Sequence, residues 1–147
     1  MSPIAITGIL AIDHVGIAVP DLAAAITFYQ GAFNAQVLHQ EENQEQGVVE
    51  AMLAIGSEVG SNSGTLIQLL APLTPDSAIA RFLDKSGAGM QQLAFRVEDV
   101  RQAAAQARAL HIRTLYEEPK RGTHGWLVNF LHPKDCGGVL IELIEEQ

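Results

Sequence analysis

The chain has 147 residues and a formal net charge of −8, with 9 Lys and Arg against 17 Asp and Glu. An acidic chain without a basic run cannot neutralise a row of phosphates, which argues against binding to nucleic acid or to an anionic membrane. Hydrophobic residues make up 48% of the sequence, Cys136 is its one cysteine, and no uninterrupted apolar stretch approaches about 18 residues. The sequence therefore predicts a single cytoplasmic domain, residues 1–147, with a buried core and neither a disulfide nor a membrane span.

The first half of the sequence begins with an alternating apolar strand from about Ile12 that ends before Asp21. A helix is expected over about Leu22–Ala32, because apolar residues recur there every three to four positions, and Asp21 can cap it. Three further strands are expected in this half: Ala35–Gln40, Val48–Ile55 and Leu66–Leu70. Two polar stretches are expected to be loops: the run with Glu41, Glu42 and Glu45, and the Gly- and Ser-rich segment 56–64.

The second half repeats this order after a linker, residues 73–89, in which a short helix is expected over Ser77–Lys85. A strand containing Gln92 precedes a helix expected over Val100–Leu110, which Asp99 can cap. Three strands are expected to follow: Ile112–Tyr116, Trp126–Leu131 and Leu140–Ile144. The repeat predicts an α+β fold built of two β-α-β-β-β modules, residues 12–72 and 90–145.

The repeat aligns four polar residues that interrupt apolar strands. His14 aligns with Gln92 at an offset of 92 − 14 = 78, and Gln68 aligns with Glu142 at 142 − 68 = 74. Such side chains are costly to bury without partners, and imidazole, amide carbonyl and carboxylate groups all bind divalent cations. Taken singly, each has an ordinary alternative: a solvent-facing Gln or Glu, or a hydrogen-bonded core His. Together they predict one metal site.

Four stretches carry a family resemblance: residues 12–18, 45–53, 67–73 and 132–143. The sequence resembles the methylmalonyl-CoA epimerases of the vicinal oxygen chelate superfamily over about Ile12 to Glu142. The resemblance implies paired modules that form a cupped mixed sheet around a divalent metal, most often cobalt. It also implies a homodimer that interconverts the two C2 epimers of methylmalonyl-CoA.

The resemblance assigns roles to individual residues. It implies that His14, Gln68 and Glu142 are metal ligands and that Glu50 moves the proton. Many members of the family have a His pair where this chain has Gln91 and Gln92, so the fourth ligand is expected to be Gln92. Because an amide carbonyl is a harder and weaker donor than imidazole, manganese, magnesium or zinc could replace cobalt more readily. The substitution also argues against an extradiol dioxygenase, which needs two His and a carboxylate on Fe(II).

Epimerisation at C2 explains why such residues are needed. Removing the C2 proton leaves an enolate, whose charge a divalent metal can stabilise as a Lewis acid. Inversion also needs proton transfer on both faces of that enolate, which Glu50 and Glu142 could provide as base and acid. Alternation along the strand predicts that Glu50 shares a face with Val48, while Val49 points to the other face. The alternative for Glu50 is a solvent-facing position on an edge strand.

The uneven distribution of charge suggests where the CoA phosphates dock. All nine Lys and Arg lie in residues 81–147, and residues 1–80 contain eight acids. The nucleotide end is therefore expected near basic residues of the second half or linker: Arg81, Lys85, Lys120, Arg121 and Lys134. Two other functions remain open: a glyoxalase-type isomerase acting on a thiol adduct, and a metal-free protein of the same fold that binds small molecules.

Overall fold

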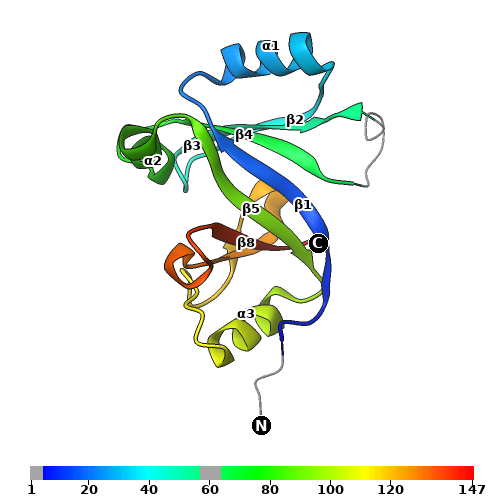
Figure 1. Ribbon diagram of the computed structural model, residues 1–147, viewed down its shortest axis with the longest axis vertical. Coiled ribbons are helices and arrows are strands. Elements are labelled where there is room, and N and C mark those ends of the chain that lie inside the picture. The colour runs from blue at the N-terminus through cyan, green and yellow to red at the C-terminus, as the bar shows by residue number, and fades with distance from the viewer. Residues whose placement is uncertain (1–4, 57–63) are drawn as a thin grey trace. The chain divides into compact units, whose positions relative to one another are not determined.

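The strands and helices of the protein follow the order β-α-β-β-β twice (Figure 1). The computed structural model describes residues 5–56 and 64–147, so the interior of the predicted loop 56–64 lies outside the described residues. The chain divides into two units. The first-half unit is His14–Gln91, and the second-half unit is Gln92–Gln147 together with the described residues before His14. The predicted α+β fold of two β-α-β-β-β repeats is confirmed.

The first repeat forms a mixed four-stranded sheet with one helix against it. Its elements are β1 (Ile9–Ala18), α1 (Leu22–Phe33), β2 (Gln36–Asn43), β3 (Val48–Ala54) and β4 (Leu66–Pro72). Strand β4 pairs in parallel with β1 and antiparallel with β3, and β3 pairs antiparallel with β2. Glu41 and Glu42 were expected in a loop but lie in β2, because β3 offers hydrogen-bonding partners as far as Asn43. Helix α2 (Ala78–Ser86) then follows where a linker helix was predicted.

The second repeat has the same pairing. Its elements are β5 (Gly89–Val97), α3 (Val100–Ala109), β6 (Lys120–Arg121), β7 (Leu127–Leu131) and β8 (Leu140–Glu145). Strand β8 pairs in parallel with β5 and antiparallel with β7, and β7 pairs with β6. The register reproduces the offsets in the sequence, because Gly16 lies opposite Gln68 and Ala94 lies opposite Glu142. The internal repeat is therefore a repeat of structure.

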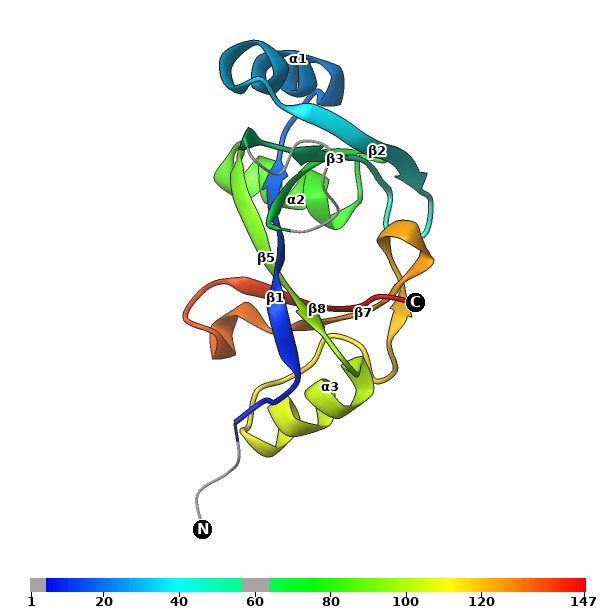
Figure 2. The ribbon, with the colours of Figure 1, turned by 90° about the vertical axis from the view of Figure 1, so that its right-hand side faces the viewer.

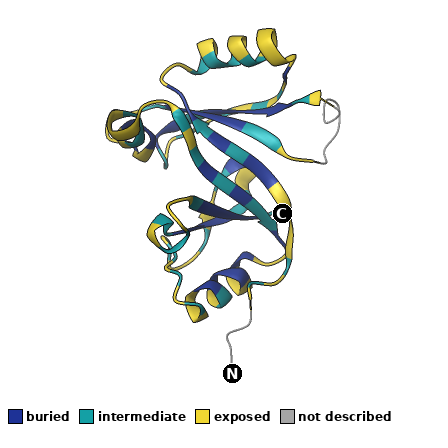
Figure 3. Cartoon of the chain, in the orientation of Figure 1, coloured by how far each residue is buried: buried dark blue, intermediate teal, exposed yellow. Residues whose placement is uncertain are grey.

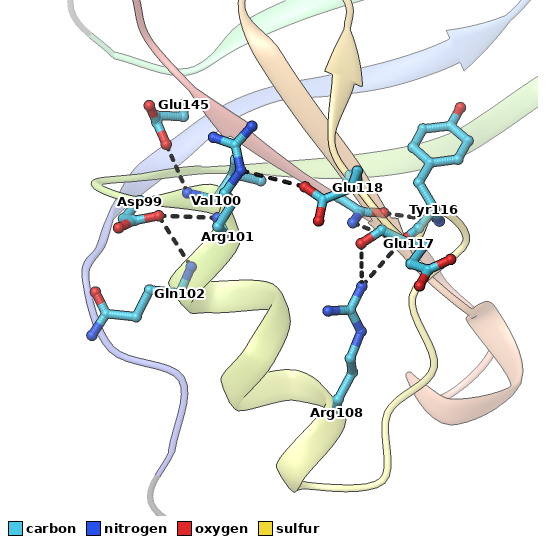
Figure 4. Close-up of polar contacts among 10 residues, drawn as sticks. Asp99, Val100, Arg101, Gln102, Arg108, Tyr116, Glu117, Glu118 and Glu145 are labelled. Carbon is cyan, nitrogen blue, oxygen red and sulfur yellow. Dashed lines mark hydrogen bonds and ion pairs between the residues drawn. The ribbon is translucent and has the colours of Figure 1, made fainter.

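The strand expected over Ile112–Tyr116 was wrong. This segment forms only an isolated bridge between Thr114 and Leu131, and the strand beside β7 is instead β6. Backbone hydrogen bonds join Leu115 to Phe130 and His132 to Arg113, but at Tyr116 a side chain takes over. The Tyr116 amide donates to Asn129 Oδ1 at 3.1 Å, and Asn129 Nδ2 donates to the Tyr116 carbonyl at 3.0 Å. Arg108 also donates to the carbonyls of Tyr116 and Glu117 (Figure 4).

The long helix of each repeat covers one face of its own sheet. Helix α1 lies over a cluster that includes Ala51, Leu53 and Leu69, yet none of its own residues is fully buried (Figure 3). Helix α3 runs alongside β7 and β8 (Figure 2) and buries Ala103 and Ala107. These contacts place one apolar cluster of each unit between helix and sheet. The other sheet face carries a smaller apolar cluster, with Val48 and Leu70 in the first-half unit and Val128 and Ile144 in the second, together with polar residues.

Asp21 and Asp99 cap α1 and α3 as predicted, and a hydroxyl caps α2. Asp21 accepts a hydrogen bond from the Ala24 amide, and Ser77 Oγ accepts one from the Ala80 amide. Asp99 accepts from two amides of the first turn of α3, while Glu145 Oε1 accepts from the Val100 amide at 2.8 Å (Figure 4). These groups satisfy amides that have no partner within the helix. In the described part of the chain, no helix is long and apolar enough to cross a bilayer.

Candidate active site

Three of the predicted site residues share the face of the first-half sheet that α1 does not cover. Gln68 lies opposite Gly16 on β1 and opposite Met52 on β3, and directly paired residues point to the same side of a sheet. Alternation then places His14 and Glu50 on that side as well. The predicted shared face of Val48 and Glu50 follows from the same register, so Glu50 is not an exposed edge residue.

Glu50 and Gln68 form a buried pair on this face. Gln68 Nε2 donates to Glu50 Oε2 at 2.8 Å, and the two residues are 2% and 3% exposed, respectively. His14 is fully buried beside them in the sheet. A carboxylate taken out of water is costly even with one good hydrogen bond. Keeping it here is typical of a functional site rather than of a core built for stability.

Strand β2 adds two residues to this face through a β-bulge. The pairing with β3 shifts by one residue between Val37 and His39. Val37 consequently points into the core under α1, whereas His39 and Glu41 turn to the polar face. Glu41 lies directly opposite Glu50, and its Oε1 is 3.3 Å from His39 Nε2. The sequence predicted a loop at Glu41 and no role for His39, because alternation alone does not reveal a bulge.

The second-half unit carries a matching pair. Gln92 Nε2 donates to Glu142 Oε1 at 2.8 Å, and both residues are buried. Register places them on the sheet face opposite α3, because Gln92 and Ala94 alternate with core residues and Ala94 lies opposite Glu142. Each unit therefore buries one carboxylate that accepts a hydrogen bond from a glutamine amide.

The donor chemistry of these pairs fits a divalent cation. Each glutamine directs its NH₂ group to a carboxylate, so its carbonyl oxygen is the atom suited to bind a cation. Among the described residues, no three His, Cys, Asp or Glu side chains are grouped to hold a metal. A metal site would therefore depend on the glutamines. Each unit contributes one half of the predicted ligand set: His14 and Gln68, and Gln92 and Glu142.

Arg96 and Asp13 form a partly buried ion pair that the sequence did not predict. Arg96 Nε donates to Asp13 Oδ1 at 2.9 Å within the second-half unit, and the Asp13 side chain is almost fully buried. Asp13 immediately precedes His14, and Arg96 lies two residues beyond Ala94. The pair therefore fixes both first strands of the repeats next to candidate ligands. A charged residue within an apolar alternating strand was the signal in the sequence.

The basic residues that were predicted to bind the CoA phosphates lie in both units. Lys120 Nζ lies 4.3 Å from the centroid of the Tyr116 ring, which is close enough for a cation–π interaction. Arg121 donates to the Gly125 carbonyl at 2.7 Å, and the Lys134 amide donates to His132 Nδ1 at 3.1 Å. These three lie in the second-half unit, whereas Arg81 and Lys85 belong to α2 of the first-half unit.

Two further titratable groups lie away from the polar faces. Hydrogen bonds from Arg113 lower the pKa of Asp135 to about 2, and burial raises the pKa of the neighbouring Cys136 thiol. A raised pKa reduces the thiolate fraction, so Cys136 lacks the activation that a nucleophilic cysteine needs.

Comparison with known proteins gives consistent matches. Residues 13–130 match the glyoxalase/bleomycin resistance protein/dioxygenase superfamily. The mitochondrial methylmalonyl-CoA epimerase of Homo sapiens is 44% identical over 133 residues, which are 90% of this chain and 72% of that protein. The crystal structure of methylmalonyl-CoA epimerase from Mycobacterium tuberculosis is 46% identical, with a TM-score of 0.89, covering 98% of this chain and 93% of that one. A methylmalonyl-CoA epimerase in complex with methylmalonyl-CoA and NH₄⁺ is 45% identical, with a TM-score of 0.87 and coverage of 94% and 95%.

Proposed function

Because the chain belongs to the glyoxalase/bleomycin resistance protein/dioxygenase superfamily and, within it, to the methylmalonyl-CoA epimerase family, we propose that it interconverts the two C2 epimers of methylmalonyl-CoA. One observation carries the proposal: each unit buries a single carboxylate that accepts a hydrogen bond from a glutamine amide on the polar face of its sheet. Inversion at C2 needs two proton-transfer groups, and Glu50 and Glu142 are those groups.

Glu50 takes the C2 proton on one face of the substrate and Glu142 returns a proton on the other, and the reverse reaction exchanges their roles. The hydrogen bonds from Gln68 and Gln92 hold one oxygen of each carboxylate in place. The NH₂ groups of Gln68 and Gln92 orient these oxygens without competing for the proton, because a neutral amide donates hydrogen bonds but does not act as a base near neutral pH. Burial keeps bulk water from quenching the enolate.

We also propose that a divalent cation takes part, held by His14, Gln68, Gln92 and Glu142. Cobalt is the expected ion by family resemblance, with manganese, magnesium or zinc as alternatives, because glutamine replaces an imidazole ligand. When bound, such an ion supplies Lewis-acid stabilisation of the enolate oxygen. The protein contributes one anionic ligand, Glu142, and the hydrogen bond from Gln92 orients that carboxylate.

The CoA part of the substrate needs cationic partners, since the protein carries a net charge of −8. We propose that Lys120, Arg121 and Lys134 bind its phosphates. Tyr116 presents Lys120 through the cation–π contact, and the backbone of Tyr116 is itself fixed by Asn129. A homodimer and a cytoplasmic location are further proposals by resemblance, although the human relative is named as mitochondrial.

The test is deuterium incorporation at C2. The purified protein is incubated in D₂O with one epimer of methylmalonyl-CoA, after chelation and after addition of Co²⁺, Mn²⁺, Mg²⁺ or Zn²⁺. We expect deuterium at C2 together with racemisation, and dependence on the cation. Absence of exchange with every cation would refute the epimerase. Turnover of a thiol adduct of an α-ketoaldehyde would then favour the isomerase, and saturable binding without turnover the binding protein.

A further inference from the structure

The most informative feature that the proposed reaction leaves unused is the pair His39 and Glu41 on β2. We propose that Glu41, supported by His39, is the group through which Glu50 exchanges its proton with solvent between turnovers. The inference rests on the proposed epimerase function, because it supposes that Glu50 accepts the C2 proton. Glu41 acts through Glu50 and is a positioning residue for proton exchange, without contact to the substrate.

The need for such a group follows from the stoichiometry of a two-base reaction. After one conversion in a given direction, Glu50 holds the substrate proton and Glu142 has given one up. The enzyme cannot repeat the same conversion until both carboxyl groups return to their starting states. Glu50 is only 3% exposed, so its proton needs a path to water.

Glu41 is the residue near Glu50 that leads toward solvent, since His14 on the same face is fully buried. On its own strand the next residues on the same face are Val48 and Met52, and on β4 the directly paired residue is Leu70. Gln68 donates an amide hydrogen bond and cannot take up the carboxyl proton near neutral pH. Of the described side chains paired with Glu50 on β2 and β4, Glu41 is the one that can accept a proton.

The position of Glu41 suits this role. Directly opposite side chains of an antiparallel pair have Cβ atoms about 4.5–5.5 Å apart, a span that two carboxyl groups or one bridging water can cover. The side chains of Glu41 and His39 are each 31% exposed, and His39 Nε2 lies 3.3 Å from Glu41 Oε1. The pair therefore connects a buried carboxylate to the edge of the sheet, since β2 pairs on one side only within the first-half sheet.

The proton balance closes without a co-reactant. The O–H bond of protonated Glu50 breaks and an O–H bond forms on the Glu41 carboxylate. The Glu41 proton then passes to His39 or directly to solvent water, which restores the carboxylates of Glu41 and Glu50, and Glu142 takes up one proton from solvent water in the same interval. The β-bulge between Val37 and His39 makes this geometry possible, because a regular strand would put Val37, His39 and Glu41 all on one face.

The experiment compares Glu41→Gln and His39→Gln with the wild-type protein, and Glu42→Gln is the matched control. Glu42 is the next residue on β2, is exposed, and faces the other side of the sheet opposite Val49. Initial rates are measured in both directions over a range of methylmalonyl-CoA concentrations. Glu50 and Glu142 return to their starting protonation states after product release. A variant that slows this return lowers kcat and leaves kcat/KM unchanged.

For Glu41→Gln we expect kcat to fall by about tenfold or more with kcat/KM within about twofold of wild type. Small buffer acids such as formate should restore part of kcat, and His39→Gln should show a weaker version of the same pattern. Unchanged kcat in both variants, or an equal fall of kcat and kcat/KM without rescue by buffer, would overturn the inference. If Glu41→Gln fails to fold, His39→Gln decides by the same criteria. Inactivity of the wild-type protein would instead refute the proposed function.

Discussion

Replacing Glu50 with Gln tests whether this buried carboxylate serves catalysis rather than stability. The amide keeps the size of the side chain and can still accept the hydrogen bond that Gln68 Nε2 donates at 2.8 Å. It cannot remove a proton from C2. Loss of a general base lowers rates by about 10²- to 10⁴-fold, which corresponds to about 3–5 kcal/mol of activation free energy. We expect a loss of kcat of that size.

The same substitution should not destabilise the fold. Burial of a carboxylate costs several kcal/mol, and a charge-assisted hydrogen bond returns about 1.5–3 kcal/mol of that cost. A neutral amide at position 50 avoids the charge penalty and keeps a hydrogen bond that contributes about 1 kcal/mol. The free energy of unfolding of Glu50→Gln is therefore expected to be unchanged or raised by about 1 kcal/mol.

The assays are deuterium incorporation at C2 and urea denaturation followed by circular dichroism, with Glu42→Gln as a matched exposed control on the adjacent strand. Retention of more than about a third of wild-type kcat would refute the assignment of Glu50 as a base. A loss of more than about 2 kcal/mol in unfolding free energy would show that the carboxylate is structural, and the loss of activity would then say nothing about its chemistry.

Three further substitutions test the surroundings of the site. Asn129→Ala removes three hydrogen bonds made by a fully buried side chain to the backbone of Tyr116 and Phe130, and urea denaturation should show a loss of about 3 kcal/mol. Asp99→Ala removes the cap of α3, with an expected loss of about 1 kcal/mol by the same method. Arg113→Gln should raise the pKa of Asp135 from about 2 toward about 4, as measured by NMR titration. Since that pKa is depressed in the folded state, the contribution of Asp135 to stability is complete above its unfolded pKa and is lost as pH falls towards 2.

The repeat in the sequence was sufficient to predict most of the fold. A strand buries its apolar face only when it pairs with its neighbour. Apolar strands that repeat at offsets of 78 and 74 residues therefore imply that both halves have the same pattern of strand pairing. The register of Gly16 with Gln68 and of Ala94 with Glu142 follows that rule. Alternation within β3 correctly placed Glu50 on the polar face, because a regular strand has a period of two.

Departures from regular structure were not predictable in this way. The bulge that turns His39 to the polar face inserts one residue without any Gly or Pro to mark it. The segment before β6 has the composition of a strand, yet its ladder stops after two backbone hydrogen bonds, and Asn129 and Arg108 bind the backbone of Tyr116 instead. Asp13 and Arg96 are 83 positions apart in the sequence, and a pairing of that range depends on the tertiary fold.

The two units are equal in fold but not in the placement of their carboxylates, and this limits what internal symmetry can reveal. Glu50 pairs with Leu70 in the first repeat, and the equivalent position of the second repeat is Val128, which pairs with Ile144 and is fully buried. The carboxylate of the second unit lies instead on its closing strand, at Glu142, where the first unit has Gln68. Aligning the polar residues of the two repeats therefore identifies Glu142 and misses Glu50, although each unit has one glutamine–carboxylate pair. Proton transfer to opposite faces of one planar enolate requires two groups that need not be equivalent, so the chemistry sets the number of carboxylates rather than their symmetry.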